Sequence, residues 1–199
     1  SPESLVSVKK GQVTTNPIAG TRPRGKDERE DKALAEELLA DEKEVAEHRM
    51  LVDLGRNDIG KIAQNNSVEI TKYMEVEYFR YVMHLTSVVR GQLLPQLTAM
   101  DALKSTLPAG TVSGAPKIRT MKRIYELEQE KRGVYAGAIG YLSATGDMDF
   151  AIAIRTMVLK NGRAYVQAGA GIVYDSIPTN EYQETINKAK SMTKIGEMQ

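Results

Sequence analysis

The sequence predicts a mixed fold in which helices and β-strands are both abundant. Helical periodicity covers residues 32–59, where apolar side chains recur on one face. Two alternating runs rich in β-branched and aromatic residues follow at 68–79 and 82–91, as expected of neighbouring strands. Three more strand-like runs lie between residues 135 and 175, and a last helix is expected after them.

The composition excludes several classes of protein. The chain has 199 residues, 41% of them hydrophobic, which suffices for a sizeable core. No apolar run approaches the roughly 20 residues that span a bilayer, and no signal-like segment opens the chain, so we expect a soluble, cytoplasmic protein without membrane contact. A net charge of +1 argues against nucleic acid as a partner. With no cysteine and two histidines, a bound metal would be a hard cation held by oxygens, and Mg²⁺ suits that best.

The N-terminal region is expected to be a strand followed by a long loop. Residues 1–8 have strand character, and the Ser-Pro-Glu opening without an initiator methionine suggests the middle of a longer protein. Residues 12–31 contain prolines, glycines and many charges, which predicts a loop. Within it, Arg22 and Arg24 are a weak indication of an anion site, and a solvated linker is the plainer interpretation.

Two glutamates fall within the apolar stripe of the second expected helix, residues 41–59. By helical periodicity, Glu47 shares a sector with Leu51 and Leu54, and Glu44 lies at its edge. A buried lone carboxylate costs several kcal/mol unless it is paired, protonated or bound to a cation. The pair is therefore a functional candidate, whereas the Arg56-Asn57-Asp58 run that follows is interpreted mainly as structural.

The last helix, expected from about Asn180 to Lys190 with Thr179 as its N-cap, carries a second pair of glutamates. Glu181, Glu184 and Lys188 lie within one sector of about 60°. An apolar stripe at Tyr182, Ile186 and Ala189 leaves open that these charges are an ordinary solvated i,i+4 contact. If the two helices face each other, their four carboxylates suit a magnesium ion held partly through water.

Other candidates lie on strands and loops. His84 is on the second alternating strand, where a packed core role is the commoner one. Residues 110–114 offer N–H groups and hydroxyls before a helix expected at about Pro116, a natural place for an anion. Arg155 interrupts an apolar run and so faces solvent or an anion, and Tyr135 precedes a glycine-dense strand where a ligand could approach the backbone.

Six ordered motifs together closely resemble the C-terminal half of the chorismate-utilising enzymes, above all anthranilate synthase component I. The resemblance runs almost from end to end of the chain. The motifs are PIAGTRPRG, ExxEHRMLVDLGRND, LPAGTVSGAPKIRTM, YAGAIGY, AIAIRTM and AGAGIVYDSIPTNEYQETINKA. The resemblance implies an α+β fold of antiparallel sheets packed as a sandwich with outer helices, with residues 1–199 forming the C-terminal portion of a chorismate-binding catalytic domain.

The resemblance also implies roles for the charged residues. Mg²⁺ would lie between the two glutamate pairs, with Glu47 and Glu184 as direct ligands and Glu44 and Glu181 acting more through water. The ion would hold the ring carboxylate of chorismate, and Glu44 would also protonate the leaving 4-hydroxyl. His84 matches the family histidine implicated in the elimination of pyruvate.

The remaining site residues are assigned by the same resemblance. The carboxylate of the enolpyruvyl arm requires cations and N–H donors. Gly20, Thr21 and Thr111 would line the pocket, and Thr111 is also a catalytic candidate. The arm itself would be bound by Tyr135, Arg155, Lys188 and the backbone of Gly169, Ala170 and Gly171.

The resemblance leaves three functions open. Ala19 replaces the nucleophilic lysine common in aminodeoxychorismate synthases, which favours direct attack by ammonia and an anthranilate product. Because the chain lacks cysteine, ammonia would come from a separate glutamine amidotransferase subunit in a hetero-oligomer, and a homo-oligomer is left open. The alternatives are an aminodeoxychorismate, isochorismate or salicylate synthase, and an inactive piece with only a binding or interaction role.

Overall fold

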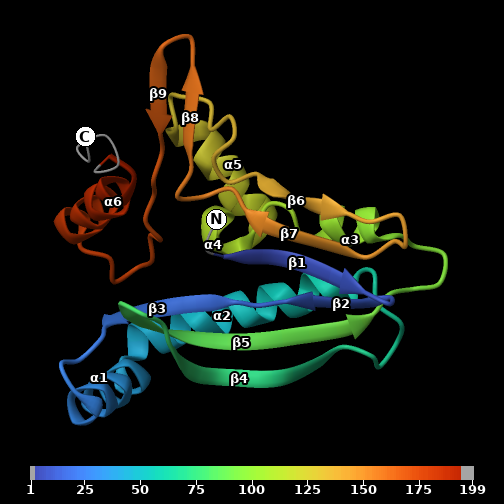
Figure 1. Ribbon diagram of the computed structural model, residues 1–199, viewed down its shortest axis with the longest axis horizontal. Helices are drawn as coiled ribbons and strands as arrows, with labels where there is room; N and C mark the ends of the chain where they lie inside the picture. Colours follow the sequence, from blue (N-terminus) through green and yellow to red (C-terminus); the bar gives the residue numbers. More distant parts are fainter. Residues whose placement is uncertain (1–2, 194–199) are drawn as a thin grey trace.

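The computed structural model of the chain describes residues 3–193, and it is built around one antiparallel sheet (Figure 1). The seven strands are arranged in the order β3-β5-β2-β1-β7-β6, with β4 pairing on β5. A separate two-stranded sheet joins β8 and β9. The strands are β1 (Ser4–Lys9), β2 (Gln12–Thr15), β3 (Ile18–Pro23), β4 (Glu69–Tyr78), β5 (Val82–Gln92), β6 (Ala138–Leu142), β7 (Met148–Ile152), β8 (Met157–Lys160) and β9 (Arg163–Val166).

Six helices accompany these sheets, and the α+β class with antiparallel strands is confirmed. The long helix α2 lies along β3 and β5, whereas α6 lies at the far left of Figure 1, joined to β9 by residues 167–177. No helix among residues 3–193 has the length and hydrophobicity needed to cross a bilayer. The helices are α1 (Glu28–Ala40), α2 (Glu42–Gly60), α3 (Ala99–Thr106), α4 (Gly110–Ser113), α5 (Lys117–Leu127) and α6 (Pro178–Thr193).

The main core lies where α2 and α3 cover the centre of the sheet. Val6, Val13, Val52, Ile59 and Val89 are each at most 1% exposed, and they come from β1, β2, α2 and β5. Burying side chains of this size contributes on the order of 1.5–3 kcal/mol each. The core therefore fixes α2 against the sheet, and with it the register of every side chain on that helix.

The predicted loop over residues 12–31 is wrong. Residues 12–15 pair with β5 as β2, residues 18–23 pair further along the same strand as β3, and α1 begins at Glu28. The Asp27 side chain accepts a hydrogen bond from the Glu30 N–H and so caps α1 four residues before the predicted start. Short strands beside a proline and a bulged glycine have weak local signals, and here β5 supplies the pairing that the local sequence does not indicate.

The C-terminal strands are shorter than predicted. The expected strand over 149–162 divides into β7 and β8, because Arg155 adopts a positive φ of 49° between them. The third expected run keeps strand geometry only in β9. The hairpin turn at Asn161-Gly162 is confirmed, with both residues at positive φ as a type I′ turn requires.

Candidate active site

The first half of the candidate site is the N-terminal part of α2, which carries Glu44 and Glu47. The helix is capped by the Asp41 side chain, which accepts hydrogen bonds from the backbone N–H groups of Lys43 and Glu44. Arg22 of β3 donates to the other oxygen of Asp41 at 2.8 Å. The cap therefore ties the first turn of α2 to β3, and both glutamates remain half-buried.

Behind the glutamates, His48 fastens α2 to the sheet. Its ring is fully buried, and Nε2 lies 2.6 Å from Oγ of Ser87 on β5. The same hydroxyl accepts a hydrogen bond from the backbone N–H of Met74, a residue at positive φ in an irregular part of β4. Burial lowers the pKa of His48 to about 4, so the ring is neutral near pH 7 and acts as a structural anchor.

Two glycines allow the backbone to approach the glutamates closely. A Cβ atom on Gly20, which has φ +70°, would lie 3.3 Å from Oε2 of Glu44. A Cβ atom on Gly171 would lie 2.9 Å from Oε1 of Glu47. The structure thus brings residues far apart in the sequence, from β3 and from the segment before α6, against the two carboxylates of α2.

The second half of the site is α6, and its exposed face differs from the predicted one. Glu181 is 6% exposed, whereas Tyr182, assigned to an apolar stripe, is 68% exposed. The helix begins at Pro178, so Thr179 lies inside it and the predicted N-cap is wrong. Burial of Glu181 follows from its partners, because its carboxylate contacts the ammonium group of Lys43 at 3.3 Å across the gap between helices.

Glu184 and Lys188 of α6 form an ion pair with each other, as the solvated-pair alternative expects. Lys188 contacts Glu184 one turn earlier, and it also donates a hydrogen bond to the carbonyl oxygen of Gly169 at 3.2 Å. Glu184 is exposed, and Lys188 is half-buried. Lys188 therefore links α6 to the glycine-rich segment that also reaches Glu47 through Gly171.

The charges of the two helices act on one another. Burial raises the pKa of Glu47, and the negative charges of Glu44 and Glu184 raise it further, while Lys43 and Lys188 lower it. Burial likewise raises the pKa of Glu44, with contributions from Asp41 and Glu184, while Lys43 and Arg22 lower it. Carboxylates from α2 and α6 thus share one electrostatic environment in which negative charge is in excess.

The geometry of His84 defines its tautomer. Nδ1 lies 3.0 Å from the carbonyl oxygen of Gly20 and 3.1 Å from Oγ1 of Thr21. Because a carbonyl can only accept, Nδ1 carries the proton, and Nε2 of the neutral ring is left as a proton acceptor. The Phe79 ring packs beside it at a centroid distance of 5.5 Å. Thr21, Gly20 and His84 form one contiguous group.

Tyr135 lies against the glycine-rich segment before α6, and the charge of Arg155 acts on it. A Cβ atom on Gly169 would lie 2.9 Å from the Tyr135 hydroxyl, so the ring and the glycine-rich segment are in contact. Arg155 is exposed, and its charge acts on both Tyr135 and Glu3. Two of the predicted residues of the enolpyruvyl-arm site, Tyr135 and Lys188, thus lie against Gly169.

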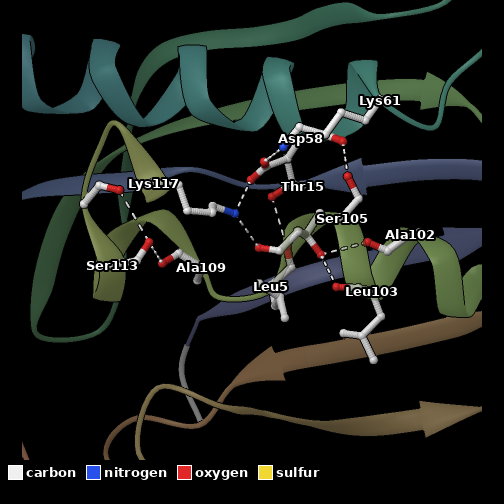
Figure 2. A network of polar contacts seen from close by, with 12 residues as sticks. Leu5, Thr15, Asp58, Lys61, Ala102, Leu103, Ser105, Ala109, Ser113 and Lys117 are labelled. Carbon is white, nitrogen blue, oxygen red and sulfur yellow. Dashed lines mark hydrogen bonds and ion pairs between the residues drawn. The ribbon is translucent and has the colours of Figure 1, made fainter. Parts of the chain in front are cut away.

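Thr111 is placed by a different network, shown in Figure 2. Lys117 donates to Oδ2 of Asp58 at 2.6 Å and to the carbonyl oxygen of Thr106 at 3.0 Å, and Lys61 also pairs with Asp58. Asp58 is 4% exposed, which confirms its structural role. This buried pair fixes both ends of the loop that carries Thr111, which lines a small cavity of about 50 Å³ between α2, α4 and β1.

Two weaker indications of anion sites are not supported by the hydrogen bonds and ion pairs. The N–H groups of Val112, Ser113 and Gly114 do not face a ligand, because they donate to carbonyl oxygens of Ala109 and Gly110 within the α4 turn. The two arginines of the N-terminal segment are already neutralised by carboxylates. Arg22 pairs with Glu37 and Asp41, and Arg24 pairs with Asp31.

Sequence analysis missed two residues of the site. Lys43 gave no signal beyond its place beside Glu44, because its partner Glu181 is distant in the sequence. Glu3 was counted only as part of the opening strand. Burial raises the pKa of Glu3, and Arg155, Lys188 and His84 lower it, so this carboxylate lies among the predicted substrate-binding side chains.

The arrangement fits a hard divalent cation by its donor set. In the part of the chain that the structure describes, no three acidic or histidine side chains are already drawn together tightly enough to hold a metal ion. Glu181 is turned to Lys43 and Glu184 to Lys188. However, four carboxylates from two helices share the region, and burial together with neighbouring negative charges raises the pKa values of Glu44 and Glu47.

The chain belongs to the chorismate binding enzyme family, whose pattern it matches over residues 1–194. Among individual relatives, it is 66% identical over 197 residues to anthranilate synthase component 1 of Lactococcus lactis subsp. lactis (strain IL1403), covering 99% of this chain and 43% of that protein. It is 57% identical over 198 residues to the protein of the same name from Aquifex aeolicus (strain VF5), an alignment that covers 100% of this chain and 40% of that protein.

Solved structures agree with the fold. The crystal structure of anthranilate synthase component I from Streptococcus pneumoniae TIGR4 has 81% identity and a TM-score of 0.89, covering 97% of this chain and 42% of that one. The structure of the menaquinone-specific isochorismate synthase of Escherichia coli has 28% identity and a TM-score of 0.86, and the match covers 97% of this chain and 44% of that one. The chain thus spans less than half the length of these relatives.

Proposed function

We propose that this chain forms the chorismate-binding part of an anthranilate synthase component I, which converts chorismate and ammonia into anthranilate, pyruvate and water. The observation that carries the proposal is the meeting of two carboxylate-bearing helices beside the Gly20-Thr21-His84 group. One side of the site is acidic and suits a metal-bridged carboxylate. The other offers cations for a second carboxylate, as a dicarboxylate substrate requires.

Residues around Gly169 would bind the enolpyruvyl arm. Lys188 already donates to the Gly169 carbonyl oxygen, and the Tyr135 hydroxyl lies against the same glycine. Arg155 is exposed, so its guanidinium is accessible to a carboxylate. The backbone of Ala170 and Gly171 would supply N–H donors, and Gly171 leaves room for the ring between the arm site and Glu47.

Two side chains would transfer protons. Burial raises the pKa of Glu44, which favours the protonated acid that can donate to the leaving 4-hydroxyl of the ring. His84, with its proton held on Nδ1 by the Gly20 carbonyl, presents Nε2 as the base for the elimination that releases pyruvate. Thr21 shares the Nδ1 contact and would line the pocket beside them. Thr111 would line it from α4.

Mg²⁺ is part of the proposal as the cofactor. Glu47 and Glu184 would bind it directly, with Glu44 and Glu181 contributing through water. When bound, the ion would hold the ring carboxylate and polarise the ring for displacement of the 4-hydroxyl.

The ammonia source and the location belong to the same proposal. A glutamine amidotransferase subunit would deliver ammonia, because the chain has no cysteine for glutamine hydrolysis. Co-purification with such a subunit, and cell fractionation for the expected cytoplasmic location, would test these two points.

Product analysis tests the function directly. The protein is incubated with chorismate, Mg²⁺ and ammonium, and products are identified by fluorescence and mass, beside a Glu184→Gln variant. Anthranilate that is lost in the variant supports the proposal and the role of Glu184. Aminodeoxychorismate, isochorismate or salicylate would overturn the proposed reaction, which Ala19 in β3 favours by offering no nucleophile. Chorismate binding without any product would instead indicate a binding role for this chain.

A further inference from the structure

Lys43 is the cation that connects the two halves of the site. It lies in the first turn of α2, two residues after the Asp41 cap, where the helix dipole disfavours a positive charge. Its ammonium group reaches across to Oε1 of Glu181 on α6, 3.3 Å away, and the Glu181 side chain is 8% exposed. A cation in a disfavoured helix position, paired with a nearly buried carboxylate of another helix, requires an explanation in the site itself.

The charge of Lys43 acts on three of the four carboxylates. Although burial opposes ionisation of Glu181, its pKa is lowered by hydrogen bonds from Ser176 and Lys43. Lys43 also lowers the pKa of Glu44 and Glu47, against the effect of burial. One ammonium group thus supplies much of the positive charge that keeps the cluster compatible with a folded protein.

The net charge of the four glutamates and the two lysines indicates which ion could take the place of Lys43. Fully ionised, the four glutamates carry four negative charges, and Lys43 and Lys188 carry two positive ones, which leaves two negative charges. A divalent cation would neutralise this remainder, but it, or a water bound to it, could use Oε1 of Glu181 only if Lys43 withdrew from that oxygen. Like charges a few ångströms apart repel by about 1 kcal/mol per unit pair in water, and more in a partly buried site.

We propose that Lys43 is a displaceable counter-ion, which pairs with Glu181 while the site lacks metal and is released from Glu181 when a divalent cation binds. The inference rests on the proposed function for the location of the cation. Its consequence is specific to this residue: Lys43 lowers the affinity for the cation, and its ammonium group becomes more accessible when the cation is bound. A purely structural tether between α2 and α6 would have the opposite effect on affinity.

The test is calorimetric titration of Mg²⁺, without chorismate, into the wild-type protein and the Lys43→Met, Lys43→Arg and Lys104→Met variants. Lys104 is a matched control, because it pairs with Asp101 on the exposed face of α3 and its loss removes the same charge. We expect Lys43→Met to bind Mg²⁺ at least about tenfold more tightly, from the loss of repulsion. Lys43→Arg and Lys104→Met should bind like wild type.

An unchanged or weaker affinity in Lys43→Met would overturn the counter-ion role while leaving the proposed function in place. Wild-type protein that takes up no Mg²⁺ but still makes anthranilate would overturn the counter-ion role and the metal part of the proposal together.

A second readout needs no variant. Lysines are acetylated by an amine-reactive reagent with and without Mg²⁺, and the extent is measured by mass spectrometry. Mg²⁺ should increase the reactivity of Lys43 and leave the reactivity of Lys104 unchanged. Reduced or unchanged reactivity at Lys43 in the presence of bound Mg²⁺ would contradict the displacement.

Discussion

The two helices that carry paired glutamates are held in place by different forces. Helix α2 is packed on the sheet through fully or nearly fully buried side chains, among them His48, Val52 and Ile59. Helix α6 is connected to the body by charge at two points, through Lys43–Glu181 in its first turn and the Lys188 contact with Gly169 in its third. One half of the site, on α2, is thus held in place by the hydrophobic core, whereas the other half, on α6, depends on charges that a ligand can rearrange.

The largest expected effect comes from removing a carboxylate of the packed half. Glu47→Gln should lower anthranilate formation at least about 100-fold, because it removes a proposed metal ligand that the core holds in place. Glu42→Gln is the matched control, since Glu42 is exposed on the first turn of the same helix. The measurement is steady-state formation of anthranilate at saturating Mg²⁺. Equal activities of the two variants would remove Glu47 from the site.

The next effect concerns the anchor behind α2. His48→Ala should reduce the free energy of unfolding by about 2–4 kcal/mol, since it leaves a cavity and deprives Ser87 of its partner. Tyr182→Ala on α6 should change it by less than about 0.5 kcal/mol, because that ring is exposed. Denaturant unfolding measures both. If the two losses were similar, the contrast between a packed helix and a charge-held helix would fail.

A smaller effect is the pH dependence of stability without metal. The folded-state pKa values of Glu44 and Glu47 are raised above the ordinary value of 4.5. At a pH between 4.5 and the raised pKa of each residue, the native state therefore binds more protons than the unfolded state. Stability contributed by these groups is therefore present at low pH and is lost as pH rises through their folded-state pKa values. Unfolding followed from pH 4 upward should show this loss in wild type and not in the Glu44→Gln, Glu47→Gln double variant. Saturating Mg²⁺ should suppress it.

The smallest effect separates the halves by ionic strength. At about 1 M salt, where charges are screened beyond about 3 Å, amide hydrogen exchange should accelerate in the first two turns of α6 and stay unchanged in α2. Exchange measured by mass spectrometry at low and high salt gives both values in one sample. Acceleration in both helices, or in neither, would contradict the assignment of ion pairs as the main restraint on α6.

The packed half of the site was predictable from the sequence in large part. The stripe of Leu51 and Leu54 located the glutamates of α2, because helical periodicity places side chains without knowledge of the partner. The bounds of α2, β4 and β5 agree with the predicted ones within one or two residues. Where the apolar side chains recur with the same period as the buried positions, the sequence alone is enough to predict the element and its buried face.

The charge-held half was less predictable. On α6 the exposed face holds Tyr182 and the buried one holds Glu181, because the pairing with Lys43 outweighs the usual preference for burying an aromatic ring. Strands β2 and β3 were also missed, since their pairing is supplied by β5, whose paired residues lie 59 to 80 positions away. Both failures concern partners distant in the sequence, which local patterns do not encode.

The central claim is that α2 and α6 together form a single cation site. Crystals of the protein soaked with Mn²⁺, which can replace Mg²⁺ on oxygen ligands, would locate the site by anomalous scattering. The account predicts one strong peak between the carboxylates of Glu47 and Glu184, with Lys43 turned away from Glu181. A peak at another place, or none at an occupancy that supports activity, would contradict it.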